Sequence, residues 1–173
     1  MWRQKKKYTG PRHPWQAERI EEEHKLAKEY GIRRMREIWK ARAILRRWQD
    51  LAKKIIGMPA AEREKAQKIL IEKLQKYGFL EEKVDIDNVL SLKLKDILER
   101  RLSTILVKKG MALTPKQARQ FIIHGKVMVN GQKLNRPSYL VKPNDNIEFV
   151  PGFSPKLHVE KVEINEKAEN QNG

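Results

Sequence analysis

Residues 114–134 read TPKQARQFIIHGKVMVNGQKL, and this stretch decides the fold of the C-terminal half of the chain. It starts with a capping-box pattern: a hydroxyl at the N-cap, proline at the first helical position and an amide side chain three residues after the cap. A short helix should therefore begin at Pro115 and stop at Gly125, because glycine favours a helix C-terminus. The residues that follow alternate like a strand, and Asn130-Gly131 supplies the positive backbone angles of a two-residue turn. The stretch predicts a helix followed by a β-hairpin.

The residues before this stretch predict a second helix of the same design. From Asp96 to Lys109 the apolar side chains form one stripe at helical spacing, and Gly110 ends the run. The opposite flank carries basic and hydroxyl side chains: Arg100, Arg101, Thr104 and Lys108. After the hairpin, Asn146 to Val150 is typical of a last short strand. Residues 96–150 therefore predict a small domain of two helices, a hairpin and short strands.

The N-terminal half predicts helices. Residues 14–30, 32–56 and 59–77 keep the helical spacing of apolar side chains, and residues 80–94 form a linking segment. Residues 1–13 lack any apolar period, and we expect a phosphate-rich surface to order this basic arm. Within residues 32–56, basic side chains recur on one side of the helix. They are Arg33, Arg36, Lys40, Arg47 and Lys54.

These patterns predict an α+β protein in four parts. A basic arm (1–13) and a mostly helical N-terminal domain (14–95) precede the small domain (96–150) and a polar tail (151–173). The 173 residues include 38 Lys+Arg and 22 Asp+Glu, which gives a formal net charge of +16. Residues 1–58 contribute +10 and residues 99–150 contribute +7. Because so much like charge repels itself, the chain is expected to have a polyanionic partner.

Other classes of protein and site find little support. Apolar runs reach only three residues, too few for a membrane-spanning helix or the apolar stretch of a signal peptide. The absence of cysteine excludes disulfides, thiolate chemistry and cysteine-based zinc sites. No glycine-rich phosphate loop is present, and the four histidines lack metal-ligand spacing. We therefore expect no cofactor, no metal site, no membrane and no small-molecule substrate.

Short motifs in the C-terminal half resemble a known RNA-binding domain. They are Leu98-Glu99-Arg100-Arg101-Leu102, Gly110-Met111-Ala112, Ala118-Arg119-Gln120, His124-Gly125-Lys126-Val127, Val129-Asn130-Gly131 and Pro137-Ser138. This pattern resembles the S-four RNA-binding domain, which occurs in ribosomal proteins, pseudouridine synthases, some aminoacyl-tRNA synthetases and a small heat-shock protein. The Arg-rich N-terminal helices, with Arg12-His13-Pro14-Trp15, resemble the small-ribosomal-subunit protein S-four family in its archaeal and eukaryotic cytosolic form.

The resemblance implies a structural protein of the cytoplasmic small ribosomal subunit that catalyses no reaction. It implies direct binding to small-subunit ribosomal RNA, early in assembly of the subunit body, through phosphates and sugars. It further implies a position near the side where messenger RNA enters, beside small-subunit protein S-five, and an influence on decoding accuracy.

Candidate RNA contacts follow from the basic flanks and the resemblance together. In the small domain they are Arg100, Arg101, Thr104, Lys108, Lys109, Lys116, Arg119, Gln120, His124, Lys126, Lys133 and Arg136. In the N-terminal half they are Lys5, Lys6, Lys7, Arg12, Arg33, Arg36, Lys40 and Arg47. The planar guanidinium can bridge two phosphate oxygens, so losing Arg100, Arg101 or Arg119 should weaken binding more than losing a peripheral lysine.

Two other functions stay open at this point. A pseudouridine-synthase-type RNA-modifying enzyme could use the same domain as a handle, although residues 1–95 are too short and helical for a catalytic sheet. A free-standing RNA chaperone that binds stalled large subunits is the other. Two features stay ambiguous as well: Trp15 could stack on a base, and Glu21-Glu22-Glu23 could face solvent or a basic neighbouring protein.

Overall fold

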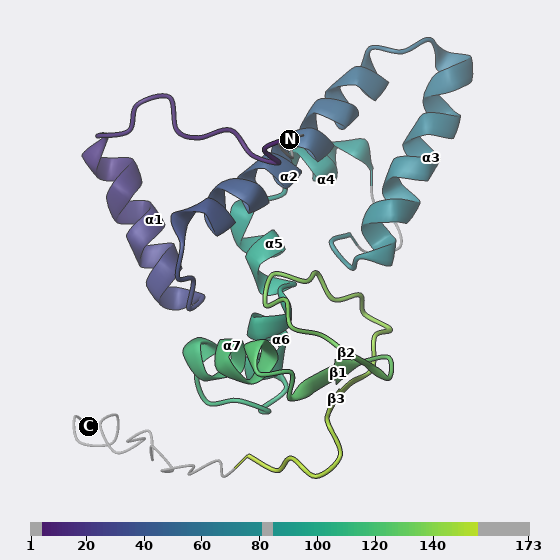
Figure 1. The fold of residues 1–173 in the computed structure, drawn as a ribbon. Coiled ribbons are helices and arrows are strands. Elements are labelled where there is room, and N and C mark those ends of the chain that lie inside the picture. The colour runs from purple at the N-terminus through teal and green to yellow at the C-terminus, as the bar shows by residue number, and fades with distance from the viewer. Residues whose placement is uncertain (1–4, 81–84, 156–173) are drawn as a thin grey trace, which may run out of the picture.

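The computed structural model describes residues 5–80 and 85–155. The first four residues of the expected arm, residues 81–84 of the linking segment and the tail beyond residue 155 lie outside the described residues. The N-terminal half contains helices α1 (Ala17–Glu29), α2 (Met35–Ile56), α3 (Ala60–Lys76), α4 (Ile86–Ser91) and α5 (Leu94–Glu99). Figure 1 shows α2 crossing the centre of this half, with α1 beside its start and α3 folded back from its end.

Helix α2 is the axis of the first hydrophobic core. It contacts α1, α3, α4 and α5, and its side chains Ile38, Leu45 and Ala52 are buried among them. Trp48 is also buried, and its ring lies 5.0 Å from that of Phe79 between centroids. The apolar stripe of α2 therefore faces inward, which leaves its basic side chains at the surface.

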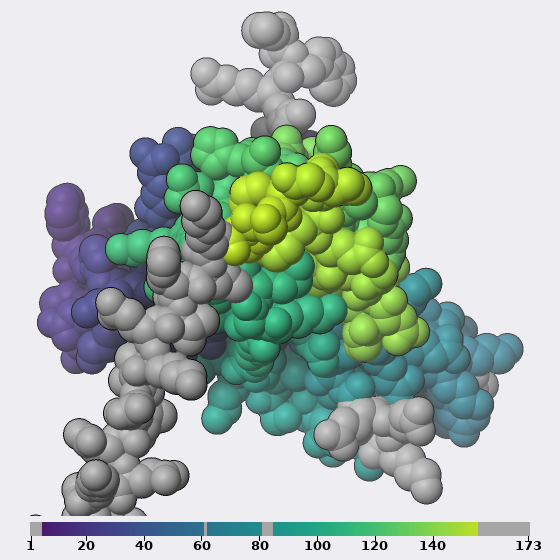
Figure 2. Space-filling model, turned by 90° about the horizontal axis from the view of Figure 1, so that it is seen from below, coloured from purple at the N-terminus to yellow at the C-terminus, as the bar shows by residue number. Residues whose placement is uncertain are grey.

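The C-terminal domain, residues 100–155, packs two helices on a small sheet. Its elements are α6 (Leu102–Lys108), α7 (Pro115–Ile123), β1 (Val127–Val129), β2 (Gln132–Lys133) and β3 (Ile147–Phe149). The sheet is antiparallel in the order β2-β1-β3, with Val129 opposite Gln132 on one side and Ile147 on the other. Seen from below in Figure 2, this domain fills the middle of the molecule, between α1 and α3. The predicted α+β class is confirmed.

The helix cap and the hairpin turn of the opening stretch are confirmed. Thr114 Oγ1 accepts a hydrogen bond from the Gln117 backbone N–H at 3.2 Å and so caps α7. The Gln117 side chain accepts from the N–H of Leu113 at 2.9 Å, one residue before the N-cap. Asn130 and Gly131 have φ of 50° and 77°, the backbone angles that the tight hairpin turn requires.

The helix expected over residues 96–109 is wrong as a single element. The chain bends at Arg100 and Arg101, which separates α5 from α6. The reason lies elsewhere in the sequence: Arg101 forms a β-bridge with Leu140, and the N–H of Val141 donates to the Arg100 carbonyl at 2.9 Å. The first core ends with Leu98 and the second begins with Leu102, so the bend is where the chain passes between cores.

Smaller differences concern the ends of the N-terminal helices. Helix α1 begins at Ala17 rather than Pro14, and α2 begins at Met35 rather than Ile32. Within the described ranges, no helix is both long and apolar enough to cross a membrane. In the same ranges, no three His, Asp or Glu side chains gather in an arrangement that could hold a metal ion.

Candidate nucleic-acid interface

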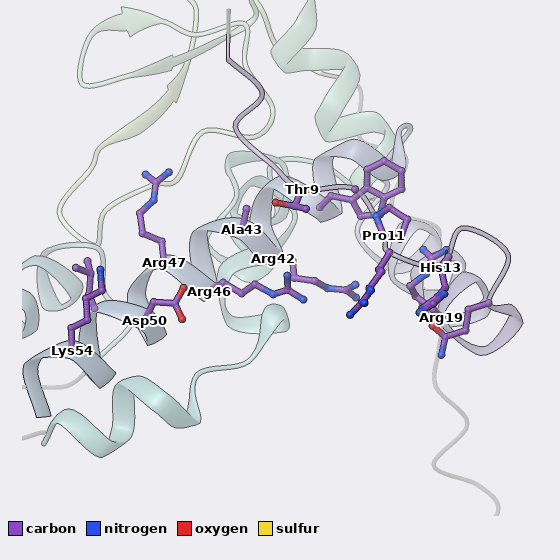
Figure 3. Close-up of a pocket in the computed structure, with 15 residues that line it drawn as sticks. Thr9, Pro11, His13, Arg19, Arg42, Ala43, Arg46, Arg47, Asp50 and Lys54 are labelled. Carbon is purple, nitrogen blue, oxygen red and sulfur yellow. The ribbon is translucent and has the colours of Figure 1, made fainter. Parts of the chain in front are cut away.

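A basic hollow of about 970 Å³ lies between α2 and the N-terminal arm (Figure 3). We call it the arm–α2 groove, and its polar lining includes Arg12, His13, Arg19, Arg42, Arg46, Arg47, Asp50 and Lys54. Figure 3 shows Arg42 and Arg46 extending from α2 toward the arm. Asp50 is the one acid among the described residues that line the groove. This local excess of positive charge favours a polyanion.

Contacts within the protein position the arm. The ring of Tyr8 lies against that of Trp39 on α2, with 5.9 Å between centroids. Arg19 Nη2 on α1 donates to the carbonyl of Pro14 at 2.8 Å and to that of His13 at 3.5 Å. The sequence predicts that this arm needs a phosphate-rich surface for order, whereas the structure holds residues 8–14 through α1 and α2.

A buried carboxylate lies beside the groove and ties α1 to α2. Glu23 is only 2% exposed. It accepts hydrogen bonds from Arg19 Nη1 at 2.9 Å, from Trp39 Nε1 at 3.1 Å and from Arg42 Nη1 at 3.5 Å. Three donors compensate the burial of one charge. Of the acidic run Glu21-Glu22-Glu23, only the first two members are exposed, so the expectation that Glu23 faces solvent or another protein is wrong.

A second carboxylate joins the helical half to the C-terminal domain. Glu37, in the first turn of α2, accepts from Arg101 Nη2 at 2.5 Å and pairs with Arg119 Nη2 at 3.0 Å. The Arg101 and Arg119 side chains are 4% and 20% exposed. Burial alone would raise the pKa of Glu37, but hydrogen bonds from Arg119 and Arg101 outweigh it and hold that pKa below its usual value. We call these three side chains the interdomain joint.

Comparison with known proteins identifies the family. Residues 100–147 match the S4 domain. The small ribosomal subunit protein uS4 of Nanoarchaeum equitans is 49% identical over 164 residues, which cover 92% of this chain and 91% of that protein. The uS4 protein of Methanosphaera stadtmanae is 41% identical over 166 residues, covering 95% and 91%. The chain belongs to the uS4 family.

Further uS4 relatives agree with this assignment. The protein of Ignicoccus hospitalis is 43% identical over 151 residues, covering 87% of this chain and 90% of its own. These relatives are archaeal, as the resemblance implied, and all are named as proteins of the small ribosomal subunit. This uS4 chain is therefore a ribosomal protein and not an enzyme. The pseudouridine-synthase and free-standing chaperone alternatives are not favoured.

Several candidate RNA contacts of the uS4 chain are engaged within the protein. Arg100 donates to the carbonyl of Gly78, and Thr104 Oγ1 donates to that of Leu98 at 2.9 Å. Lys108 pairs with Glu99 at 2.7 Å at the surface. The sequence places Arg101 on the flank opposite the apolar stripe, and that placement is wrong because the bend before α6 buries its side chain and directs it to Glu37.

Arg119 is likewise engaged, by Glu37 in the interdomain joint. The other candidates keep their side chains at the surface. In the C-terminal domain the exposed ones are Lys109, Lys116, Gln120, His124, Lys126, Lys133 and Arg136. In the N-terminal half they are Lys5, Lys6, Lys7, Arg12, Arg33, Arg36, Lys40 and Arg47. Of all these, Arg12 and Arg47 line the arm–α2 groove.

Sequence reasoning missed part of the groove. Arg42 and Arg46 were not among the candidates, although their spacing of four residues puts them on one face of α2. His13 was missed as well. A signal for Arg42 and Arg46 was therefore present, but the part that the arm plays depends on the Tyr8–Trp39 contact, which spacing along the sequence does not reveal.

Proposed function

We propose that this uS4 protein binds small-subunit ribosomal RNA directly, through the arm–α2 groove and the exposed cations of its C-terminal domain. The arm–α2 groove is the observation that carries the proposal. Six cations, Arg12, Arg19, Arg42, Arg46, Arg47 and Lys54, line it, and Asp50 is the one acid among the described lining residues. A guanidinium can hold two phosphate oxygens at once, so such a lining suits the RNA backbone better than the edges of bases.

The C-terminal domain supplies a second basic surface. Its exposed lysines include Lys116 on α7, Lys126 before β1 and Lys133 on β2. The ammonium of Lys126 also lies 5.3 Å from the ring centroid of Phe153. Because lysines act as mobile point charges, we expect this surface to follow the shape of folded RNA rather than its sequence.

The uS4 resemblance supports a more specific role. By this proposal the protein binds early during assembly of the subunit body in the cytoplasm, lies beside protein S-five and contributes to decoding accuracy. An early binder must recognise the RNA without the help of other proteins. Sedimentation of the protein with naked small-subunit RNA, with no other ribosomal protein added, tests this requirement. If the two sediment together only after S-five or other proteins are added, the early role is wrong.

Affinity measured across a salt series tests the RNA contact itself. Each neutralised phosphate contributes about −0.7 to −0.9 to the slope of log affinity against log salt, so eight contacts give a slope of roughly −6 or −7. Footprinting on naked small-subunit RNA should show protection that is lost when Arg46 and Arg47 are neutralised. A nearly flat salt dependence would contradict contact with the backbone.

A further inference from the structure

Both oxygens of the Glu37 carboxylate are used by the C-terminal domain. Arg101 Nη2 donates to Oε2, and Arg119 lies 3.0 Å from Oε1 through Nη2 and 3.2 Å from Oε2 through Nη1. Arg101 lies directly before α6, and Arg119 lies within α7. One side chain of α2 therefore holds both helices of the C-terminal domain.

Close contacts at two glycines also join the helical half to the C-terminal domain. A Cβ at Gly31 would lie 2.8 Å from Pro115 Cβ, so the turn between α1 and α2 touches the start of α7 with no space for a side chain. A Cβ at Gly78 would lie 2.6 Å from Pro143 Cγ. The two halves thus meet at separate places. Glu37 supplies the shielded ionic contact between them, whereas the Lys108–Glu99 pair is exposed at the surface.

We propose that Glu37 is a positioning residue for RNA binding. It sets the orientation of the arm–α2 groove relative to the exposed cations of the C-terminal domain, so that one folded RNA reaches both surfaces. This inference rests on the proposed function, because it concerns how the same RNA is held. Arg101 and Arg119 act through Glu37 in this arrangement rather than on phosphate.

A positioning role for Glu37 predicts the opposite of what charge counting predicts. Removing an acid from a chain with a net charge of +16 should strengthen the attraction to RNA if only charge matters. If Glu37 positions the two surfaces, its loss leaves the aligned orientation only partly populated. Apparent affinity then falls by the populated fraction, whatever the gain in charge.

The test compares Glu37→Gln with the matched control Glu64→Gln, an exposed acid on α3. With naked small-subunit RNA as the probe, Glu37→Gln should weaken binding roughly fivefold to tenfold, as an aligned population of about 10–20% would give. Its salt slope should also become shallower, because fewer phosphates are contacted at once. Glu64→Gln should bind as well as wild type or slightly tighter. The melting temperature of each variant shows that the protein is folded at the temperature of the assay.

A distance measurement separates positioning from a simple loss of stability. The chain contains no cysteine, so spin labels can be placed at Lys53→Cys on α2 and Gln132→Cys on β2 without removing native thiols. The distribution of distances between the labels should be narrow when Glu37 is present and broad in the Glu37→Gln background. Addition of RNA should narrow the broad distribution.

The possible failures are distinguishable. If wild type binds RNA with a steep salt dependence while Glu37→Gln binds equally or more tightly, only the positioning role is overturned. Unchanged label distances in Glu37→Gln overturn it as well. If wild type does not bind the RNA, the proposed function is wrong, and the positioning role falls with it.

Discussion

The arm–α2 groove and the interdomain joint both gather arginines, but they use them differently. In the groove, Arg46 and Arg47 have exposed side chains and face one acid among the described lining residues. In the joint, Arg101 and Arg119 are directed at Glu37 and are largely removed from solvent. A guanidinium therefore stays available to an external anion where the fold leaves it without a close carboxylate, and it connects domains where the fold supplies one.

The largest effect should come from breaking the joint at its most buried member. Arg101→Met keeps a long apolar stem but removes the charge that faces Glu37, and it should destabilise the protein by about 2–4 kcal/mol. Urea unfolding measures the change. Lys109→Met, at an exposed position nearby, should change stability by less than about 0.5 kcal/mol. If both variants cost the same, the joint does not stabilise the fold.

Neutralising the groove should affect RNA binding and leave folding unchanged. Arg46→Gln combined with Arg47→Gln should lower affinity about tenfold to fiftyfold at about 0.1 M salt and reduce the salt slope by about 1.4–1.8. The control removes the same charge from α3 through Lys65→Gln and Lys68→Gln, both exposed. Equal losses in the two double variants would mean that net charge, and not the groove, attracts the RNA.

Glu23, the buried carboxylate beside the groove, should contribute less to stability than the interdomain joint. Glu23→Gln keeps the shape of the side chain but removes the charge that Arg19 and Arg42 face, so we expect a loss of about 1–2 kcal/mol. Thermal unfolding measures it. The neighbouring Glu22→Gln is the control, because Glu22 is exposed and should be close to neutral. A loss in Glu22→Gln as large as that in Glu23→Gln would contradict the role of the buried network.

The smallest expected effect is a change in stability at low pH. The folded state lowers the pKa of Glu37, so its ionised form stabilises folding fully above the unfolded value of about 4.3. That contribution is lost as the pH falls through the lower folded pKa. The difference in unfolding free energy between wild type and Glu37→Gln should therefore be constant above about pH 5 and shrink below about pH 4. A difference that grows on acidification would have the wrong sign for this assignment.

Local chemistry explains which parts of the fold were predictable. Thr114, Asn130 and Gly131 act on backbone atoms within a few residues, so the α7 cap and the hairpin could be read from the sequence. The prediction of a single helix over residues 96–109 was wrong because the bend depends on backbone contacts with residues 139–141. The spacing of apolar residues along a helix does not reveal such contacts.

The site was predictable in composition but not in arrangement. Most basic candidates are exposed, as their flanks suggested, yet Arg101 is buried and Arg100 bonds to the backbone of Gly78. Arg42 and Arg46 line a groove because the contact between Tyr8 and Trp39 holds the arm beside α2. Such contacts join residues far apart along the chain, where spacing carries no information.

The sequence by itself determined the helices and hairpin in outline, the excess of positive charge and the resemblance to the S-four family, because each depends on neighbouring residues or on their sum. Only the tertiary structure decided which arginines remain free for an anion and which hold the protein together. Glu37 meets Arg101 and Arg119 across 64 and 82 residues of chain, and a pairing at that separation is fixed by how the helices pack.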